Sequence, residues 1–457
     1  MRRLGSAVAL VATVAITSAA AATTPTAGRP LLTFEVGPIT RGHAEQTIYR
    51  GLCATDLRGH TFRISDPHDN VGQAWSPDGR LIAFTRRDDN PGQDHLGDVF
   101  VTDAAGRDSR NLTRGAGRGS GNVVAWSPDG SQLILHWSGF WVETSYVENV
   151  DGGGWHRLGV DGEYVSGGSW SPQDRILFVV WSPLRTQSEW SPFWVPAIYV
   201  ADADGTHRSK LIDSAAAAVW SPDGRQFAYL AYRHRNWAGL GVAKADGSGA
   251  HLLVEGSVGP AAWSPDGRQL AYFGSFDADS VAHTLEVLQA DGSGAHLLAQ
   301  DAQGFRGDAA WSPDGSMIAF TRARRSYRLA VIRPDGTGEH VVRTGGLPAF
   351  NPVWRRPAPL PDPRPCVVRG TARADIIRGT SRGDLIYGRA GNDRIYGKGG
   401  DDVLIGGSGH DRLYGGRAND YFPARDGVRD VIFGGTGHDT RAFDPVDVVQ
   451  SAQPRNY

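Results

Sequence analysis

A nine-residue period near the C-terminus constrains the fold of this chain more than any other feature. Aspartates recur at intervals of nine residues, and a glycine precedes each of the first six by five positions. An aliphatic or aromatic residue follows each of these aspartates by two positions. Nine residues provide one turn and one short strand, so the period predicts a parallel β-roll in which two units make one coil. The aspartates are Asp375, Asp384, Asp393, Asp402, Asp411, Asp420 and, after an interruption at 423–429, Asp430 and Asp439.

Stacking of such coils would bring the carboxylates into rows. Aspartates eighteen residues apart, such as Asp375, Asp393 and Asp411, are expected on one edge, and the set that begins at Asp384 on the other. Carboxylate and carbonyl oxygens at this density are the ligands that Ca²⁺ prefers, so we predict calcium as the cofactor. A metal-free glycine-rich solenoid or a disordered tail is the alternative. The predicted metal ligands are Asp375, Asp384, Asp393, Asp402, Asp411, Asp420 and Asp439.

This pattern resembles the calcium-binding nonapeptide repeats of RTX proteins, Gly-Gly-x-Gly-x-Asp-x-aliphatic-x. The best copies are residues 406–411 and 434–439. The first two copies, which end at Asp375 and Asp384, lack most of the internal glycines, so we expect a cap that binds calcium weakly or not at all. The interruption before Asp430 leaves the role of that residue open. RTX toxins typically carry a C-terminal export signal, whereas an N-terminal leader is expected for this chain, so toxin or protease activity does not follow from the resemblance.

A second repeat fills residues 31–356. Successive tryptophans lie 43 to 51 residues apart, the length of one four-stranded propeller blade. In each unit proline and glycine favour a type I turn between two strands of alternating polarity. We therefore predict an all-β chain, with a six- or seven-bladed β-propeller, seven preferred, followed by a C-terminal parallel β-roll. The motif Trp-Ser-Pro-Asp-Gly begins at Trp75, Trp126, Trp220, Trp263 and Trp311, with variants at Trp170 and Trp354.

The two ends of this repeat region complement each other. Segments 31–34, 47–55 and 61–64 have the pattern of the last three strands of a blade, and 353–354 that of a first strand. Joining them would complete a seventh blade and remove two exposed sheet edges. Cys53 and Cys366 flank this junction, and a disulfide between them would lock it in an oxidising compartment. Two free buried thiols are the alternative.

The tryptophan repeats are similar to the WD40-like propeller repeats of the TolB family, a resemblance that implies a fold and no particular activity. We interpret the aspartates of the repeated turns as turn formers: Asp78, Asp129, Asp223, Asp266 and Asp314. Loops between the second and third strands of several blades place aromatic and basic residues on one rim, where we expect a protein or glycan ligand. Packing of extended hairpins on their own blades is the alternative. The rim residues are Trp181, Trp190, Phe193, Trp194, Trp237 and Arg324.

The remaining features bear on location and activity. Two arginines, an apolar stretch at 7–16 and small residues at 18–22 predict a signal peptide over 1–22 and a secreted protein, with the periplasm or cell surface as alternatives. A Pro-rich linker at 357–366 would join the propeller to a roll over 367–449.

The net charge of −2 argues against a general nucleic-acid binder, and we expect no membrane span. Because no linear catalytic motif occurs, we expect a binding protein and no enzyme. A TolB-like scaffold with a purely structural roll, and a propeller enzyme acting on polysaccharide or peptide, remain alternatives.

Overall fold

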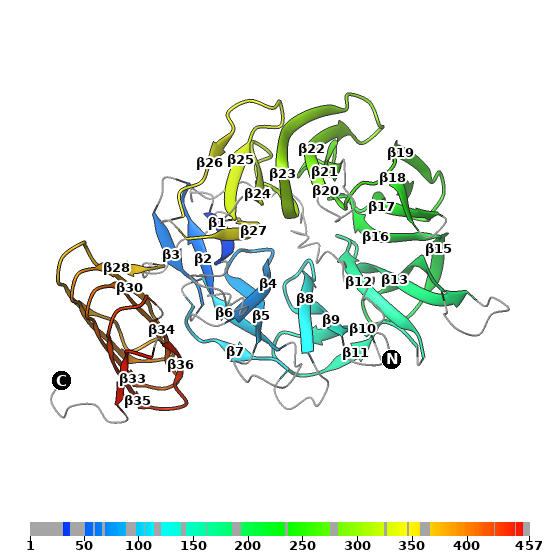
Figure 1. Cartoon of the computed structure of the whole chain (residues 1–457). Helices are drawn as coiled ribbons and strands as arrows, with labels where there is room; N and C mark the ends of the chain where they lie inside the picture. The colour runs from blue at the N-terminus through cyan, green and yellow to red at the C-terminus, as the bar shows by residue number, and fades with distance from the viewer. Residues whose placement is uncertain are drawn as a thin grey trace.

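The computed structural model contains strands and turns and, within the residues it describes, no helix. The strands of the first 355 residues form a ring of seven blades, and those from residue 368 onward form a two-sheet roll beside the ring (Figure 1). The predicted leader at 1–22 and most of the predicted linker lie outside the described residues. These are 31–36, 51–57, 60–65, 69–87, 97–104, 106–113, 120–138, 143–160, 162–184, 193–233, 236–274, 282–323, 327–344, 347–356, 366–424, 426–443 and 445–450.

Six blades follow one another along the chain, each an antiparallel sheet whose first strand lies nearest the axis (Figure 1). Blade one comprises β4 (Asp69–Trp75), β5 (Leu81–Arg87), β6 (Asp98–Asp103) and β7 (Arg110–Asn111). Blade two comprises β8 (Ser120–Trp126), β9 (Gln132–Ser138), β10 (Glu143–Asn149) and β11 (Trp155–Arg157). Blade three comprises β12 (Tyr164–Trp170), β13 (Arg175–Leu184), β14 (Phe193–Asp202) and β15 (Ser209–Asp213). Blade four comprises β16 (Ala215–Trp220), β17 (Gln226–Arg233), β18 (Asn236–Lys244) and β19 (His251–Glu255).

Blades five and six share the long strand β23 (His296–Trp311), which ends one blade and begins the next. Before it come β20 (Ala261–Trp263), β21 (Gln269–Gly274) and β22 (Ala282–Gln289). After it come β24 (Ile318–Arg322), β25 (Arg328–Ile332) and β26 (His340–Val341).

Both ends of the repeat region build blade seven, as the sequence predicts. Its strand order is β27-β1-β2-β3, so the last strand of the ring pairs with the first strand of the chain. Thr33 lies opposite Val353 in this register, and the Thr33 hydroxyl donates to the Val353 carbonyl at 2.8 Å. The strands are β27 (Ala349–Arg355), β1 (Leu31–Val36), β2 (Leu52–Thr55) and β3 (Thr61–Arg63).

The repeated tryptophans connect neighbouring blades. Each ring is buried, and in four cases the indole N–H donates to a main-chain carbonyl of the preceding blade. A buried N–H without a partner is destabilising, so these bonds tie the ring of blades together while they satisfy the indole. The pairs are Trp126 to Ala74 (2.9 Å), Trp263 to Val219 (3.1 Å), Trp311 to Ala262 (3.0 Å) and Trp354 to Ala310 (2.9 Å).

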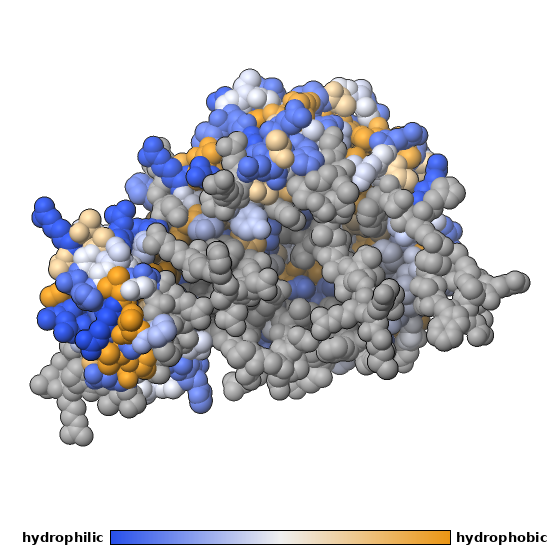
Figure 2. Space-filling view, viewed as in Figure 1, coloured by the Kyte–Doolittle hydropathy of each residue, from blue (hydrophilic) through white to orange (hydrophobic). Residues whose placement is uncertain are grey.

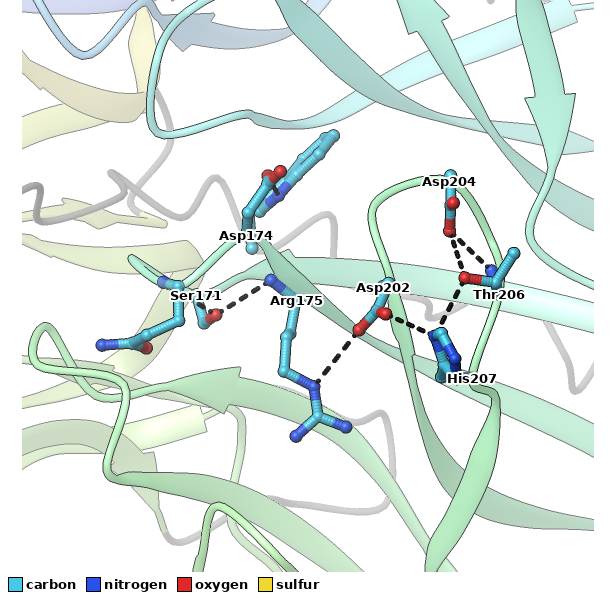
Figure 3. Close-up of polar contacts among 9 residues, drawn as sticks. Ser171, Asp174, Arg175, Asp202, Asp204, Thr206 and His207 are labelled. Atoms are coloured by element: carbon cyan, nitrogen blue, oxygen red, sulfur yellow. Dashed lines mark hydrogen bonds and ion pairs between the residues drawn. The ribbon is translucent and has the colours of Figure 1, made fainter.

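Aspartates in the blade turns bond to their own turns. In the common turn, a serine hydroxyl and a main-chain N–H donate to the aspartate, as Ser127 and Ser131 do to Asp129, and these bonds lower the pKa of Asp129. Blade three carries the variant turn, in which Asp174 accepts from the indole N–H of Trp170 at 2.7 Å (Figure 3). In the adjacent turn Asp202 pairs with His207 at 2.7 Å, while Thr206 donates to Asp204 (Figure 3). These contacts give the turn aspartates Asp129, Asp174, Asp202 and Asp204 a structural role.

The roll stacks alternate nonapeptides into two parallel sheets. We call the first the docked sheet; it contains β28 (Val368–Arg369), β30 (Leu385–Ala390), β32 (Val403–Ser408), β34 (Tyr421–Ala424) and β36 (Thr440–Phe443). The second is the outer sheet, with β29 (Ile376–Arg378), β31 (Arg394–Gly399), β33 (Arg412–Arg417), β35 (Val431–Thr436) and β37 (Val448–Gln450). The residue two positions after each of the first seven repeat aspartates points inward and fills the core between the sheets: Ile377, Ile386, Ile395, Leu404, Leu413, Phe422 and Ile432.

The docked sheet packs against blade seven. Leu385 and Val403 share one hydrophobic cluster with Cys53 and with residues of blades six and seven. A disulfide joins Cys53 in β2 to Cys366, with both side chains fully buried and the Cα atoms 5.9 Å apart. The buried Arg63 guanidinium donates to the Cys366 carbonyl, and Arg86 of blade one forms an ion pair with Asp401 at 3.1 Å. The roll is therefore held at the junction where the ring closes.

Candidate metal centre

The repeat aspartates form two rows along the edges of the roll, in the sets that the 18-residue spacing predicts. Within a row, the backbone N–H of each aspartate donates to Oδ1 of the aspartate one coil later, at 2.7 to 3.1 Å. Row one consists of Asp375, Asp393, Asp411, Asp430 and Asp447, and row two of Asp384, Asp402, Asp420 and Asp439. One oxygen of each later carboxylate is thus used to hold the coils in register.

The second carboxylate oxygen is the chemically informative one. In five of the row aspartates Oδ2 is buried and accepts no hydrogen bond from any part of the chain that the structure describes. Each of these side chains is about 1% exposed. A buried carboxylate oxygen without a partner is strongly destabilising, so an arrangement repeated five times fits the coordination of a cation. The five residues are Asp393, Asp402, Asp411, Asp420 and Asp430.

The first aspartate of each row is different. Oδ2 of Asp375 accepts from the backbone N–H (2.6 Å) and the hydroxyl (2.9 Å) of Thr371. Oδ2 of Asp384 accepts the same two bonds from Thr380, at 2.6 and 2.9 Å. Threonine replaces the second glycine of the repeat here, and its hydroxyl occupies the oxygen that stays unpartnered in later coils. This gives a physical reason for the cap expected of the first two copies.

The glycines five residues before the central four aspartates, Asp393, Asp402, Asp411 and Asp420, are required by the position of the same oxygen. A Cβ atom on Gly397 would lie 2.1 Å from Oδ2 of Asp402, and one on Gly406 would lie 2.2 Å from Oδ2 of Asp411. Such contacts are far shorter than van der Waals distance. The glycines therefore give the carboxylate its place beside the main chain of the turn.

Burial makes these carboxylates hard to ionise without a cation. Burial raises the pKa of Asp402 to about 9, although the hydrogen bond from the Asp384 N–H opposes the shift, and the charges of Asp420 and Asp384 add to it. The same cause raises the pKa of Asp420 to about 8, of Asp430 to about 7 and of Asp411 to about 6. The pKa of Asp393 is also raised by burial. The rows consequently favour either protonation or a bound cation.

Sequence reasoning missed part of this arrangement. Asp430 and Asp447 extend row one through steps of 19 and 17 residues, which a strict nine-residue count does not detect. A second ladder involves the residue before the aspartate: His410 N–H donates to Asn392, and Asn419 N–H donates to Asp401. Among the described residues, no three His, Cys, Asp or Glu side chains converge to hold a metal ion by themselves.

Two of the predicted rim residues have side chains that the structure describes. Trp181 donates its indole N–H to the Ser166 hydroxyl at 2.7 Å and contacts the Tyr232 ring edge-on. Trp194 packs edge-on against Tyr164, with ring centroids 4.3 Å apart. These aromatic rings pack on their own blade and its neighbour. Phe193 and Trp237 lie in strands β14 and β18 with their side chains outside the description, and Trp190 and Arg324 lie outside the described residues altogether.

Comparison with known proteins identifies the repeats that contain the two rows of aspartates. Four copies of the RTX calcium-binding nonapeptide repeat match residues 369–404, 396–422 and 429–440. The roll consists of RTX repeats. The matched RTX segments contain the five aspartates with an unpartnered oxygen, and their description implies calcium binding. No curated protein matches the chain.

Solved structures resemble the propeller that precedes the RTX repeats. Puromycin hydrolase, as its S511A mutant complexed with PGG, has a TM-score of 0.50 and 14% identity, over 82% of this chain and 65% of that one. TolB from Acinetobacter baumannii has a TM-score of 0.43 and 14% identity, over 72% and 83%. An oligogalacturonate lyase in complex with manganese has a TM-score of 0.46 and 14% identity, over 68% and 85%. At this identity the likeness concerns the fold. Within the described residues, no helix is long and apolar enough to cross a membrane.

Proposed function

We propose that this is a secreted calcium-binding protein whose C-terminal roll holds Ca²⁺ along both rows of aspartates. The observation that carries the proposal is the set of five buried Oδ2 atoms without a hydrogen-bond donor. Hard, anionic oxygens at this density suit Ca²⁺, which takes six to eight oxygen ligands. Because side chains alone do not complete a site, main-chain carbonyls of the turns would supply the other ligands.

The ligand assignment follows the environment of each oxygen. Asp393, Asp402, Asp411, Asp420 and Asp430 would be the main ligands, and Asp439 continues row two. Asp375 and Asp384 would contribute weakly, because threonine already occupies their second oxygen. Bound calcium would supply the positive charge that keeps these buried carboxylates ionised and relieves their mutual repulsion.

The propeller would act as a platform for a protein or glycan ligand rather than as an enzyme. Support comes from the absence of linear catalytic motifs in the sequence. The predicted leader would direct the chain to a compartment where calcium is abundant. We infer that the roll orders after export, since calcium is scarce inside cells.

Calorimetric calcium titration of the full chain tests the proposal. A variant with Asp393, Asp402, Asp411 and Asp420 changed to Asn keeps the Oδ1 acceptors but removes four charges, and we expect at least a tenfold loss of affinity or a loss of bound ions. The matched control changes four exposed turn aspartates of the propeller to Asn, Asp204, Asp246, Asp291 and Asp335, and should titrate like the natural protein. Absence of calcium binding by the natural protein would refute the proposal.

A further inference from the structure

The two sheets of the roll present very different outer faces, although they come from the same repeat. The residue directly after each repeat aspartate points outward, because the next residue fills the core. In the docked sheet this residue is Leu385, Val403 or Tyr421, which pack against blade seven. In the outer sheet the central two positions are Arg394 and Arg412, which lie side by side in parallel register.

The outer sheet is basic across its central strands. Arg378, Arg394, Lys398 and Arg412 are exposed on adjacent strands, and none of them forms an ion pair with a described residue. No aspartate or glutamate occupies an outward position of β29, β31, β33, β35 or β37. Figure 2 shows strongly hydrophilic side chains beside hydrophobic ones on the visible surface of the roll.

A stack of aromatic rings lies along this face, on strands β31, β33 and β35 of the outer sheet. The rings of Tyr396 and Tyr414 are 4.7 Å apart and nearly parallel, and those of Tyr414 and Phe433 are 4.6 Å apart. The Arg378 guanidinium lies 4.7 Å from the Tyr396 ring centroid. Because the rings cover each other's faces, the stack leaves no open ring face between Tyr396 and Phe433.

Arg394 and Arg412 place two positive charges side by side on neighbouring strands, and this arrangement determines which ligands the surface can bind. Neighbouring parallel strands lie about 4.8 Å apart, and like charges at adjacent positions repel each other. An extended chain of anions running across the strands would relieve this repulsion, and guanidinium groups bind carboxylates and sulfates through paired hydrogen bonds. We propose that the outer sheet binds a linear anionic polysaccharide.

The same features argue against other polyanions. Single-stranded nucleic acid is usually held by aromatic faces on which bases stack, and here the faces of the central rings are already occupied. Arg394 and Arg412 present two cations in register on neighbouring strands, with Arg378 and Lys398 exposed on the same sheet, and a sugar polymer with charges along its length could contact several of them.

This inference rests on the proposed calcium binding, because calcium would neutralise the buried aspartates and leave the arginines of the roll unbalanced. The test measures binding of fluorescent hyaluronan oligosaccharides, which carry carboxylates, and heparin oligosaccharides, which also carry sulfates, to the full chain in millimolar calcium. We expect binding to at least one of them that weakens with added salt, and the stronger arm identifies the anion. In the variant R394Q/R412Q we expect about tenfold weaker binding.

The control variant R225Q/R268Q removes the same charge from exposed propeller turns and should bind like the natural protein. Calcium titration of both variants should be unchanged, which separates this proposal from the calcium proposal. Intact calcium binding with no saccharide binding, equal losses in both variants, or binding only to an oligonucleotide or to phosphatidylserine vesicles would each overturn it.

Discussion

Backbone conformation sets the strictest residue-level requirements in the roll. The fourth position of the repeat turn has positive φ, at 113° in Gly391, 131° in Gly409 and 136° in Gly437. Ala418 occupies the same position with φ at 77°. A side chain in this region costs about 1–2 kcal/mol, so the turn at Ala418 retains a correctable strain at this position.

We expect Ala418→Gly to raise the free energy of unfolding by about 0.5–1 kcal/mol, since relief of strain exceeds the extra entropy that glycine gives the unfolded chain. Urea unfolding in saturating calcium measures the change. Ala374→Gly is the control, because Ala374 is exposed in a turn and does not have positive φ. Equal effects of the two substitutions would contradict the strain argument.

The titration of the buried aspartates gives the calcium-free protein an unusual pH dependence. In the folded chain the pKa values of Asp411, Asp430, Asp420 and Asp402 are raised to about 6, 7, 8 and 9. The folded state therefore binds more protons than the unfolded state between about pH 4 and pH 9, and stability falls as pH rises through that window.

Thermal unfolding in EGTA should show a falling melting temperature from pH 5 to pH 9. Saturating calcium should reduce this slope, because the bound cation replaces the protons. Calcium affinity itself should increase with pH over the same range. A melting temperature in EGTA that rises toward pH 9 would be inconsistent with buried, unpartnered carboxylates.

At the scale of elements, the repeated tryptophans show how one motif acquires different contacts. Trp126 donates to Ala74 of the preceding blade, whereas the buried Nε1 of Trp220 has no hydrogen-bond partner among the described residues. Blade three, which precedes Trp220, carries the variant turn in which Trp170 bonds to Asp174. Within the described part of the chain, the indole bond between blades is thus absent at this junction, where the Trp220 backbone N–H donates instead to the Ser169 hydroxyl at 3.0 Å.

Replacing each indole by a phenyl ring isolates this contact. We expect Trp126→Phe to reduce the free energy of unfolding by about 1–2 kcal/mol more than Trp220→Phe, since only the first leaves a buried carbonyl unpaired. The two rings have similar burial, so the loss of volume is matched. Chemical denaturation followed by circular dichroism gives the difference, and equal losses would mean that the Trp126 bond adds no net stability.

Local pattern was sufficient to predict the strands, the turns and the two rows, because spacing and turn chemistry are properties of neighbouring residues. It was not sufficient where partners come from distant segments. Asp447 lies 17 residues after Asp430, so only stacking reveals it as a row member. Trp181 appears in the sequence as a rim residue, yet its N–H bonds to Ser166 on the adjacent strand. The docking of Leu385 and Val403 on blade seven likewise depends on tertiary arrangement.

For the whole molecule, the covalent link between propeller and roll is the dominant constraint. Cys53 and Cys366 are separated by 313 residues, so the disulfide closes a loop that contains almost the entire ring. In the chain-entropy model a loop of this size contributes on the order of 5 kcal/mol.

We expect the variant C53S/C366S to unfold at lower denaturant concentration, with a loss of up to about 5 kcal/mol, because the unfolded chain gains freedom. The natural protein treated with reductant should behave like the variant once the bond is reduced. The measurement is guanidinium unfolding with and without reductant. A variant as stable as the oxidised protein would show that apolar docking alone holds the junction.

The pairing of β1 with β27 also governs when the protein can first fold. Thr33 of β1 cannot pair with its neighbour in the sheet until Val353 of β27, 320 residues later in the chain, has been synthesised. At synthesis rates of about 5–20 residues per second, the first strand leaves the ribosome roughly 15–60 s before its partner. Blade seven, and with it the closed ring, therefore cannot form until β27 has been synthesised, whereas the other six blades do not depend on this pairing.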